Sequence, residues 1–306
     1  MDASMVGQIR SFNRTVTQRV GALSDAFLGR DRPLGPARLL WEIGPDSSEV
    51  RSLRTRLDLD SGYLSRLLRS LTDEGLVDLR PSRADGRVRT AYLTSRGRAE
   101  RAELDRRADD VARSILRPLS DRQRARLVTA MAEVERLLVA SAVQVGVCDP
   151  GHPHARFCEQ AYFAELAQRF DTGFEPAHSH TASTGELTPP AGLLLVATLH
   201  GEPAGCGALR FHGDGPGELK RMWVAPDLRG LGLGRRLLTE LEAQAAANGV
   251  RTLRLETNRS LAEAVSMYRA AGYREVDPFS DEPYAHHWFE KTLGPDSASG
   301  SMVDPP

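Results

Sequence analysis

Cysteine, lysine and long apolar runs are all scarce in this sequence. Three cysteines among 306 residues are too few for a disulfide framework, so we expect a reducing compartment and a cytoplasmic protein. No apolar run reaches the roughly 20 residues that a membrane-spanning helix needs, so we expect no membrane partner. The first residues, Met1-Asp2-Ala3-Ser4, lack the basic start and the apolar block of a signal peptide.

Positive charge rests almost wholly on arginine, because only two lysines occur. It is also unevenly distributed: residues 1–142 hold 26 arginines against 20 acidic residues, whereas residues 143–306 hold 14 basic and 21 acidic residues. A basic half indicates a polyanionic partner, and an acidic half favours cationic acceptors. The length allows two domains of ordinary size.

The helices around residue 60 carry the first functional pattern. One short helix is predicted to end near Leu57, and a second to run from Asp60 or Ser61, either of which can cap it, to Gly75. Leucines cover one face of the second helix, and its other face offers hydroxyls and arginines: Ser61, Tyr63, Ser65, Arg66 and Arg69. This arrangement is typical of a helix-turn-helix, whose second helix enters the major groove of DNA.

A hairpin is predicted directly after this helix, because two alternating segments are joined through Asp85-Gly86. Four arginines decorate its flanks and tip: Arg80, Arg83, Arg87 and Arg89. A basic hairpin beside a recognition helix is a wing, which suits contact with the minor groove and phosphates. An isolated hairpin of this kind would be only a solvated charged surface, but its position here favours DNA binding.

The first half resembles the MarR family of winged-helix regulators. The resemblance rests on Ser65-Arg66, Gly75-Leu76-Val77, and Asp85-x-Arg87 followed by Leu93-Thr94-x-x-Gly97, and it covers roughly residues 5–142. It implies a mainly α winged helix-turn-helix domain over residues 1–142. In this family a long helix after the wing and both chain ends build a homodimer. Such a dimer would read a pseudo-palindromic operator in double-stranded DNA.

The second half is organised around a strand, a glycine-rich turn and a helix. An apolar segment over residues 217–224 predicts the strand, Pro226 ends it, and glycines follow at positions 230, 232 and 234. Glycines leave backbone N–H groups accessible, and a helix N-terminus adds unpaired N–H groups and about half a positive charge. The turn should therefore hold a phosphate anion. A glycine cluster alone is equally consistent with a close-packed turn.

Residues 143–293 resemble the GNAT superfamily of N-acetyltransferases. The matching features, in order, are the strand Glu218–Val224, Arg229-x-x-Gly232-x-Gly234, the strand Leu253–Thr257, Asn258, and Met267-Tyr268 with Gly272-Tyr273. The resemblance implies an α/β acyltransferase fold with a mixed, mostly antiparallel sheet, and acetyl-CoA as cosubstrate. It also implies the residues that bind acetyl-CoA: Met222, Trp223 and Val224 along the pantetheine arm, Arg229, Gly230, Leu231, Gly232, Leu233, Gly234 and Arg235 around the pyrophosphate, and Asn258.

The same resemblance suggests two catalytic residues. Tyr268 is at the position of the general acid that protonates the leaving thiolate; alternatively, it is a tyrosine packed under the cofactor. Glu218 is the first candidate for the base, directly or through water; alternatively, it only pairs with a cationic substrate. Glu256 is interpreted as a structural strand residue.

Three further expectations concern segments around this site. Cys148, His152, His154 and Cys158 offer ligand types in close array, but their spacing departs from that of structural zinc sites, so we expect no metal. A helix over residues 155–170 is predicted to bury Phe157, and the polar segment 171–190 is predicted to be a mobile loop near the substrate cleft. Residues 294–306 are predicted to be a disordered tail.

The sequence thus predicts a bifunctional protein: a DNA-binding regulator fused to an N-acetyltransferase that acts on a small amine or a protein lysine by direct transfer. One alternative is a DNA-binding repressor whose second half only senses an acyl-CoA or another ligand. Another is an enzyme whose first half serves as a dimerisation scaffold; the arginines of the wing and the recognition helix argue against it.

Overall fold

The computed structural model describes residues 2–45, 47–81 and 88–294. The chain forms two compact units, residues 1–133 and 134–306, and each is described by itself. In the part of the chain that the structure describes, no helix is both long and apolar enough to cross a membrane. The predicted tail from residue 294 onward lies almost entirely outside the described residues. The predicted domain boundary after residue 142 stays a prediction.

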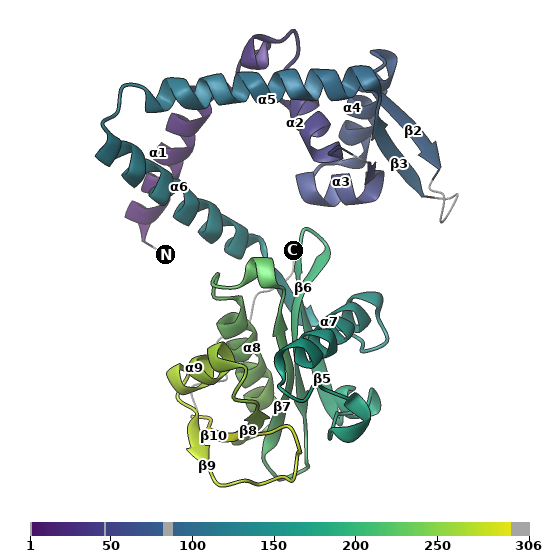
Figure 1. The fold of residues 1–306 in the computed structure, drawn as a ribbon, viewed down its shortest axis with the longest axis vertical. Helices are drawn as coiled ribbons and strands as arrows, with labels where there is room; N and C mark the ends of the chain where they lie inside the picture. Colours follow the sequence, from purple (N-terminus) through teal and green to yellow (C-terminus); the bar gives the residue numbers. More distant parts are fainter. Residues whose placement is uncertain (1, 46, 82–87, 295–306) are drawn as a thin grey trace. The chain divides into compact units, whose positions relative to one another are not determined.

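The first unit is mainly helical and contains a small antiparallel sheet of order β1-β3-β2 (Figure 1). Its elements are α1 (Ala3–Arg19), the 3-10 turn η1 (Phe27–Gly29), α2 (Leu34–Ile43), β1 (Ser48–Glu49), α3 (Val50–Leu57), α4 (Ser61–Asp73), β2 (Val77–Pro81), β3 (Arg89–Leu93), α5 (Ser95–Leu116) and the first part of α6 (Asp121–Ala142). Helix α1 ends at Arg19, and Gly21 follows with a φ of 67°, a region that favours glycine.

Helices α3 and α4 form the predicted helix-turn-helix. The Asp60 carboxylate caps α4 by accepting hydrogen bonds from the backbone N–H groups of Gly62 (2.9 Å) and Tyr63 (3.1 Å). This satisfies two of the N–H groups that every helix start leaves unpaired. The buried face of α4 packs into the core of the unit through four leucines: Leu64, Leu67, Leu68 and Leu71.

Strands β2 and β3 form the predicted wing. They pair antiparallel from Val77 opposite Leu93 to Pro81 opposite Arg89, and β1 adds a third strand beside β3. The tip of the hairpin, including the predicted contacts Arg83 and Arg87, lies outside the described residues. The expected winged helix-turn-helix fold is therefore confirmed for the elements that the structure describes.

The second unit is an α/β fold around a seven-stranded sheet of order β4-β5-β6-β7-β8-β10-β9, in which only β7 and β8 pair in parallel (Figure 1). Its elements are β4 (Gln144–Val147), α7 (Pro153–Arg169), the 3-10 turns η2 (Pro176–His178) and η3 (Gly185–Leu187), β5 (Gly192–Leu199), β6 (Glu202–Arg210), β7 (Gly217–Val224), the 3-10 turn η4 (Pro226–Leu228), α8 (Leu233–Ala247), β8 (Thr252–Thr257), α9 (Ala262–Ala270), β9 (Arg274–Val276) and β10 (His287–Thr292). The predicted mixed, mostly antiparallel sheet is thereby confirmed.

Two cores cover the two faces of this sheet. Helices α8 and α9 pack on one face and α7 on the other. The prediction for α7 was wrong at its first turns, because Phe157 is 51% exposed and Ala155 and Cys158 are buried instead. The buried residues of α7 are at positions 155, 158 and 166, which lie on the face of the helix that packs on the sheet. Phe157 lies outside this face, so its large side chain is exposed.

A bulge in β7 shapes the centre of the sheet. Cys206 stands opposite Trp223 and Ala208 opposite Lys220, so two residues of β7 face the single residue Gly207. Arg221 lies within this bulge and has a φ of 54°. Strand β7 pairs with β8 only at its first two residues, Gly217 and Glu218. Beyond that point the two parallel strands no longer exchange hydrogen bonds, which opens the sheet at its middle.

Candidate active site

Two adjoining cavities occupy the place where β7 and β8 separate. The larger cavity, of about 460 Å³, lies between α7, the end of β7, the glycine-rich turn and α9. The smaller cavity, of about 100 Å³, lies between α7, the middle of β7, the end of β8 and the segment around residue 284. Five residues line both: Tyr162, Leu166, Met222, Leu261 and Ala264. The two cavities therefore meet at the bulge of β7.

The glycine-rich turn presents backbone N–H groups to the larger cavity. Gly230 and Gly232 have φ values of 74° and 79°, a region that favours glycine. The first intrahelical bond of α8 runs from the Arg236 N–H to the Gly232 carbonyl (3.0 Å). The N–H groups of residues 233–235 precede it, so the helix does not use them. Together with the helix dipole, they form a site suited to an anion.

Most of the predicted cofactor residues line this larger cavity. They are Met222, Trp223, Val224, Arg229, Gly230, Gly232, Leu233, Gly234 and Arg235. Leu231 and Asn258 are the exceptions: Leu231 lines a separate pocket of about 60 Å³, and Asn258 lines the smaller cavity. The edge of β7 at residues 222–224 has no strand partner in β8, which leaves it available to an extended ligand.

A network of ion pairs fixes the wall of the larger cavity. The Glu165 carboxylate on α7 pairs with the Arg229 guanidinium and accepts a hydrogen bond from the Trp223 indole N–H (3.0 Å). Arg169 adds a further ion pair at 3.1 Å. Burial acts to raise the pKa of Glu165, but the hydrogen bonds from Arg229 and Arg169 outweigh it and the net pKa shift is downward. Glu165 therefore stays ionised and orients Arg229 and Trp223.

Two buried phenols lie at the smaller cavity. Tyr268 on α9 is 5% exposed, and burial raises the pKa of its hydroxyl well above the ordinary value of 10.0. Tyr162 on α7 lines both cavities, and burial raises the pKa of its hydroxyl as well. Both groups stay protonated near neutral pH, which is the state a proton donor requires.

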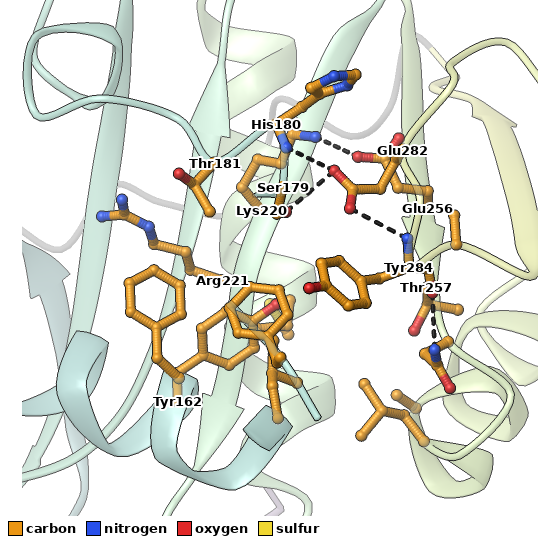
Figure 2. A pocket seen from close by; sticks show the side chains of 18 of the residues that line it. Tyr162, Ser179, His180, Thr181, Lys220, Arg221, Glu256, Thr257, Glu282 and Tyr284 are labelled. Carbon is orange, nitrogen blue, oxygen red and sulfur yellow. Dashed lines mark hydrogen bonds and ion pairs between the residues drawn. The ribbon is translucent and has the colours of Figure 1, made fainter. Parts of the chain in front are cut away.

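The remaining wall of the smaller cavity is aromatic and acidic. The ring of Phe174 lies 5.6 Å from Phe163, 5.7 Å from Phe170 and 4.9 Å from Tyr284. Figure 2 shows Tyr284 on one side of the cavity and Tyr162 on the other. The Glu282 side chain completes this wall.

The 8% exposed Glu282 ties two segments together across the cavity. Its carboxylate accepts hydrogen bonds from the Ser179 hydroxyl (3.0 Å), the His180 N–H (2.7 Å) and the Tyr284 N–H (3.3 Å). Residues 179–182, which belong to the segment predicted to be a mobile loop near the substrate cleft, line this cavity. Its mobility and its place at a substrate cleft stay predictions.

Comparisons with known proteins identify the family to which residues of the second unit belong. The sequence profile described as the Acetyltransferase (GNAT) family matches residues 159–273. A protein named IAA acetyltransferase, from Azospirillum brasilense, is 39% identical over 143 residues, which cover 46% of this chain and 86% of that protein. The chain belongs to the GNAT acetyltransferase family.

Two solved structures are also similar to parts of the chain. A putative acyl-CoA N-acyltransferase from Klebsiella pneumoniae is 28% identical with a TM-score of 0.41, covering 50% of this chain and 98% of that one. Wild-type MarR from E. coli in its apo form is 21% identical with a TM-score of 0.38, covering 41% of this chain and 93% of that one.

The GNAT unit does not bring all predicted site residues together. Glu218 lines neither cavity; its carboxylate lies 3.3 Å from His212, 3.6 Å from Arg210 and 3.7 Å from Lys220. Glu256, interpreted from the sequence as structural, lines the smaller cavity and pairs with Lys220. The predicted role of Glu218 as the base stays a prediction, and the structure adds Glu256 as a second carboxylate that lines the smaller cavity.

Asn258 lines the smaller cavity rather than the larger one. Its side-chain amide donates to the Tyr284 carbonyl (2.7 Å), and its side-chain oxygen accepts from the Ser260 N–H (2.9 Å). These bonds join the end of β8 to the segment that carries Tyr284. The predicted contact of Asn258 with the cofactor stays a prediction.

In the first unit, the predicted DNA-binding side chains are exposed. They are Ser61, Tyr63, Ser65, Arg66 and Arg69 on α4, and Arg80 and Arg89 on the wing strands. The Arg66 guanidinium lies 5.7 Å from the centre of the Tyr63 ring, and Arg80 pairs with Asp78. The exposed face of α4 thus carries cations and hydroxyls on a helix that the core holds rigidly.

Proposed function

We propose that the second unit transfers an acetyl group from acetyl-CoA directly to a primary amine, and that the first unit binds a double-stranded operator as part of a homodimer. The observation that carries the enzymatic proposal is the junction of the two cavities at the bulge of β7. One cavity ends at a helix N-terminus suited to phosphate, and the other is enclosed by phenols and carboxylates. Donor and acceptor would meet where the cavities join.

The residues of the larger cavity fit acetyl-CoA. The N–H groups of the turn and of the first residues of α8 would hold the pyrophosphate, and the unpaired edge of β7 at residues 222–224 would accompany the pantetheine arm. An N–H group of that edge would also stabilise charge that develops on the thioester oxygen. Acetyl-CoA supplies the activated acetyl group.

The reaction forms an N–C bond and breaks the thioester C–S bond. The departing sulfur takes a proton from the Tyr268 hydroxyl, and the attacking amine gives up a proton to a base. Two carboxylates can serve as that base: Glu256, which lines the smaller cavity, and the predicted Glu218, which lies behind Lys220 and would act through water. No covalent enzyme intermediate is required.

The smaller cavity favours a small acceptor over a protein lysine. Its volume of about 100 Å³ and its aromatic wall suit an amine with a planar or apolar body, and its two carboxylates suit a cationic group. A relative named IAA acetyltransferase also supports a small-molecule acceptor.

The proposed homodimer would use α1 and α6. Neither helix buries a residue within this chain, although the structure describes all of their residues. Both expose large apolar side chains, including Ile9 and Phe12 on α1 and Met131 and Leu138 on α6. A second copy would cover such surfaces, and a two-fold dimer would match a pseudo-palindromic operator.

The deciding experiment measures coenzyme A release from acetyl-CoA with a panel of small amines and lysine peptides, for wild type and Tyr268→Phe. We expect turnover with one class of small amine, a fall in kcat for the variant and unchanged acetyl-CoA affinity. Tight acetyl-CoA binding without acceptor-dependent release would instead support a non-catalytic acyl-CoA sensor.

A further inference from the structure

The end of α6 contacts the glycine-rich turn of the GNAT unit. The Arg136 guanidinium donates a hydrogen bond to the Gly230 carbonyl at 2.7 Å. A Cβ atom placed on Gly230 would lie 3.2 Å from the Arg136 Nη2 atom, so the guanidinium lies close against the backbone of the turn. Arg136 precedes the residues matched by the GNAT profile, which begin at 159.

This contact fixes the orientation of one peptide group in the turn. A trans peptide holds the carbonyl of one residue and the N–H of the next in opposite directions. Since the Gly230 carbonyl points to Arg136, the Leu231 N–H points away from it. The Leu231 side chain packs beside Ala140, near the end of α6. Arg136 therefore sets which side of the turn presents a donor.

A second contact joins α6 to the start of α8. The Arg236 guanidinium donates to the Val143 carbonyl at 2.7 Å and to the Ala140 carbonyl at 3.4 Å. Carbonyls at the end of a helix lack intrahelical partners, and a cation there is favourable. Arg236 lies in the first turn of α8, directly after the N–H groups that would hold the pyrophosphate. Arg136 thus connects α6 to the glycine-rich turn, and Arg236 connects the end of α6 to the first turn of α8.

We propose that Arg136 is a positioning residue of the acyl-CoA site and that acetyl-CoA binding and the ordering of residues 134–142 of α6 are linked. This inference rests on the proposed function, because it takes acetyl-CoA as the ligand. Acetyl-CoA bound to the turn stabilises the hydrogen bonds of Arg136 to Gly230 and of Arg236 to the end of α6. The end of α6 therefore becomes more ordered.

The test uses the full chain with Arg136→Met, Arg136→Lys and the matched control Arg122→Met, which removes an exposed arginine from the same helix. Acetyl-CoA affinity is measured by calorimetry, kcat and KM are measured separately, and hydrogen exchange is followed over residues 134–142. We expect KM for acetyl-CoA to rise about tenfold in Arg136→Met with kcat unchanged. Arg136→Lys should recover part of the affinity, because its ammonium can donate to the same carbonyl.

Acetyl-CoA should slow exchange over residues 134–142 in wild type and in Arg122→Met but not in Arg136→Met. Unchanged KM and unchanged protection in Arg136→Met would overturn the inference and leave the proposed enzymatic function intact. A parallel fall of kcat and thermal stability would assign Arg136 a purely structural role and also overturn it. Absence of acetyl-CoA binding to wild type would instead refute the proposed function itself.

Discussion

Lys220 on β7 forms an ion pair with Glu256 on β8 just beyond the point where the two strands stop exchanging backbone hydrogen bonds. Their side chains are 14% and 10% exposed, and Glu256 also accepts a hydrogen bond from the Ser280 hydroxyl at 3.2 Å. The pair therefore connects the separated strands while keeping both charges compensated. A buried charge without its partner is costly, so this contact determines how stable the opened sheet is.

We first predict that Lys220→Met destabilises the protein by about 3 kcal/mol, because it leaves the Glu256 carboxylate buried without its cation. Urea unfolding of the second unit would measure this loss. The double variant Lys220→Met/Glu256→Gln should recover most of it, since no charge is then left unpaired. Wild-type stability of Lys220→Met would show that the pair contributes nothing, and an equal loss in the single and double variants would show that the loss does not come from an unpaired charge.

Tyr268→Phe should lower kcat about 10²-fold and leave acetyl-CoA affinity unchanged, because only proton donation is removed. The control Tyr273→Phe removes a hydroxyl from a buried tyrosine that lines neither cavity, and it should keep wild-type kcat. Comparable losses in both variants would assign Tyr268 to packing.

The pH dependence follows from the raised pKa of Tyr268. The folded chain keeps this proton above pH 10.0, where an ordinary tyrosine of the unfolded chain releases it. Deprotonation of Tyr268 should therefore not lower kcat as the pH rises to 10. The free energy of unfolding should fall above that pH, because the unfolded chain then releases a proton that the folded chain keeps. A descending limb in kcat near pH 8 that Tyr268→Phe abolishes would contradict this assignment.

Gly232→Ala should weaken acetyl-CoA binding, because Gly232 has a φ of 79° at the start of α8 and its N–H lies next to the anion site. Gly249→Ala is the matched control, since Gly249 has a φ of 81°, open space around its Cα and a position after the other end of α8. Both variants should lose about 1 kcal/mol of stability from the left-handed conformation. Only Gly232→Ala should raise the Kd for acetyl-CoA, measured by calorimetry.

Two carboxyl variants should identify the base. Glu256→Gln should lower kcat if the carboxylate that lines the cavity takes the proton, whereas Glu218→Gln should then have a small effect. A larger loss of kcat in Glu218→Gln would instead assign the base to Glu218, which would act through water because it lies behind Lys220. The kcat values of the two variants, measured with saturating acetyl-CoA, distinguish the two assignments.

In the first unit, replacing Arg66 and Arg69 with alanine should weaken DNA binding and reduce its dependence on salt. Each lost phosphate contact lowers the slope of log affinity against log salt by about one. The probe would be a duplex selected by the wild-type protein from a randomised pool. Each single alanine variant is compared with Arg113→Ala, which removes one exposed arginine from α5 and should bind that duplex as wild type does.

The features predicted correctly are those encoded locally. The cap of α4, predicted at Asp60 or Ser61 and found at Asp60, the leucine face of α4 and the glycine-rich turn before α8 depend on spacings within a few residues, which the sequence displays directly. The extent of α7 was predicted well, but its buried face was not, because a large aromatic residue suggested burial that the helix phase does not give to Phe157.

The features that were missed depend on tertiary packing. Glu165 and Tyr162 become site residues only because α7 crosses the gap between β7 and β8. Glu256 lines the smaller cavity where β7 and β8 have separated, and no spacing within one strand reveals that separation. The contact of Arg136 with Gly230 joins residues 94 positions apart, and neither carries a local signal for the other.

The bulge in β7 also makes this strand intolerant of changes in length. Side chains alternate between the two faces of a strand, so one additional residue reverses the phase of all that follow. Leu219 and Met222 consequently pack on the α8 side, and Trp223 packs on the α7 side. Deleting Arg221 would leave the amino acids after it unchanged, but each of their side chains in β7 would point to the opposite face of the sheet.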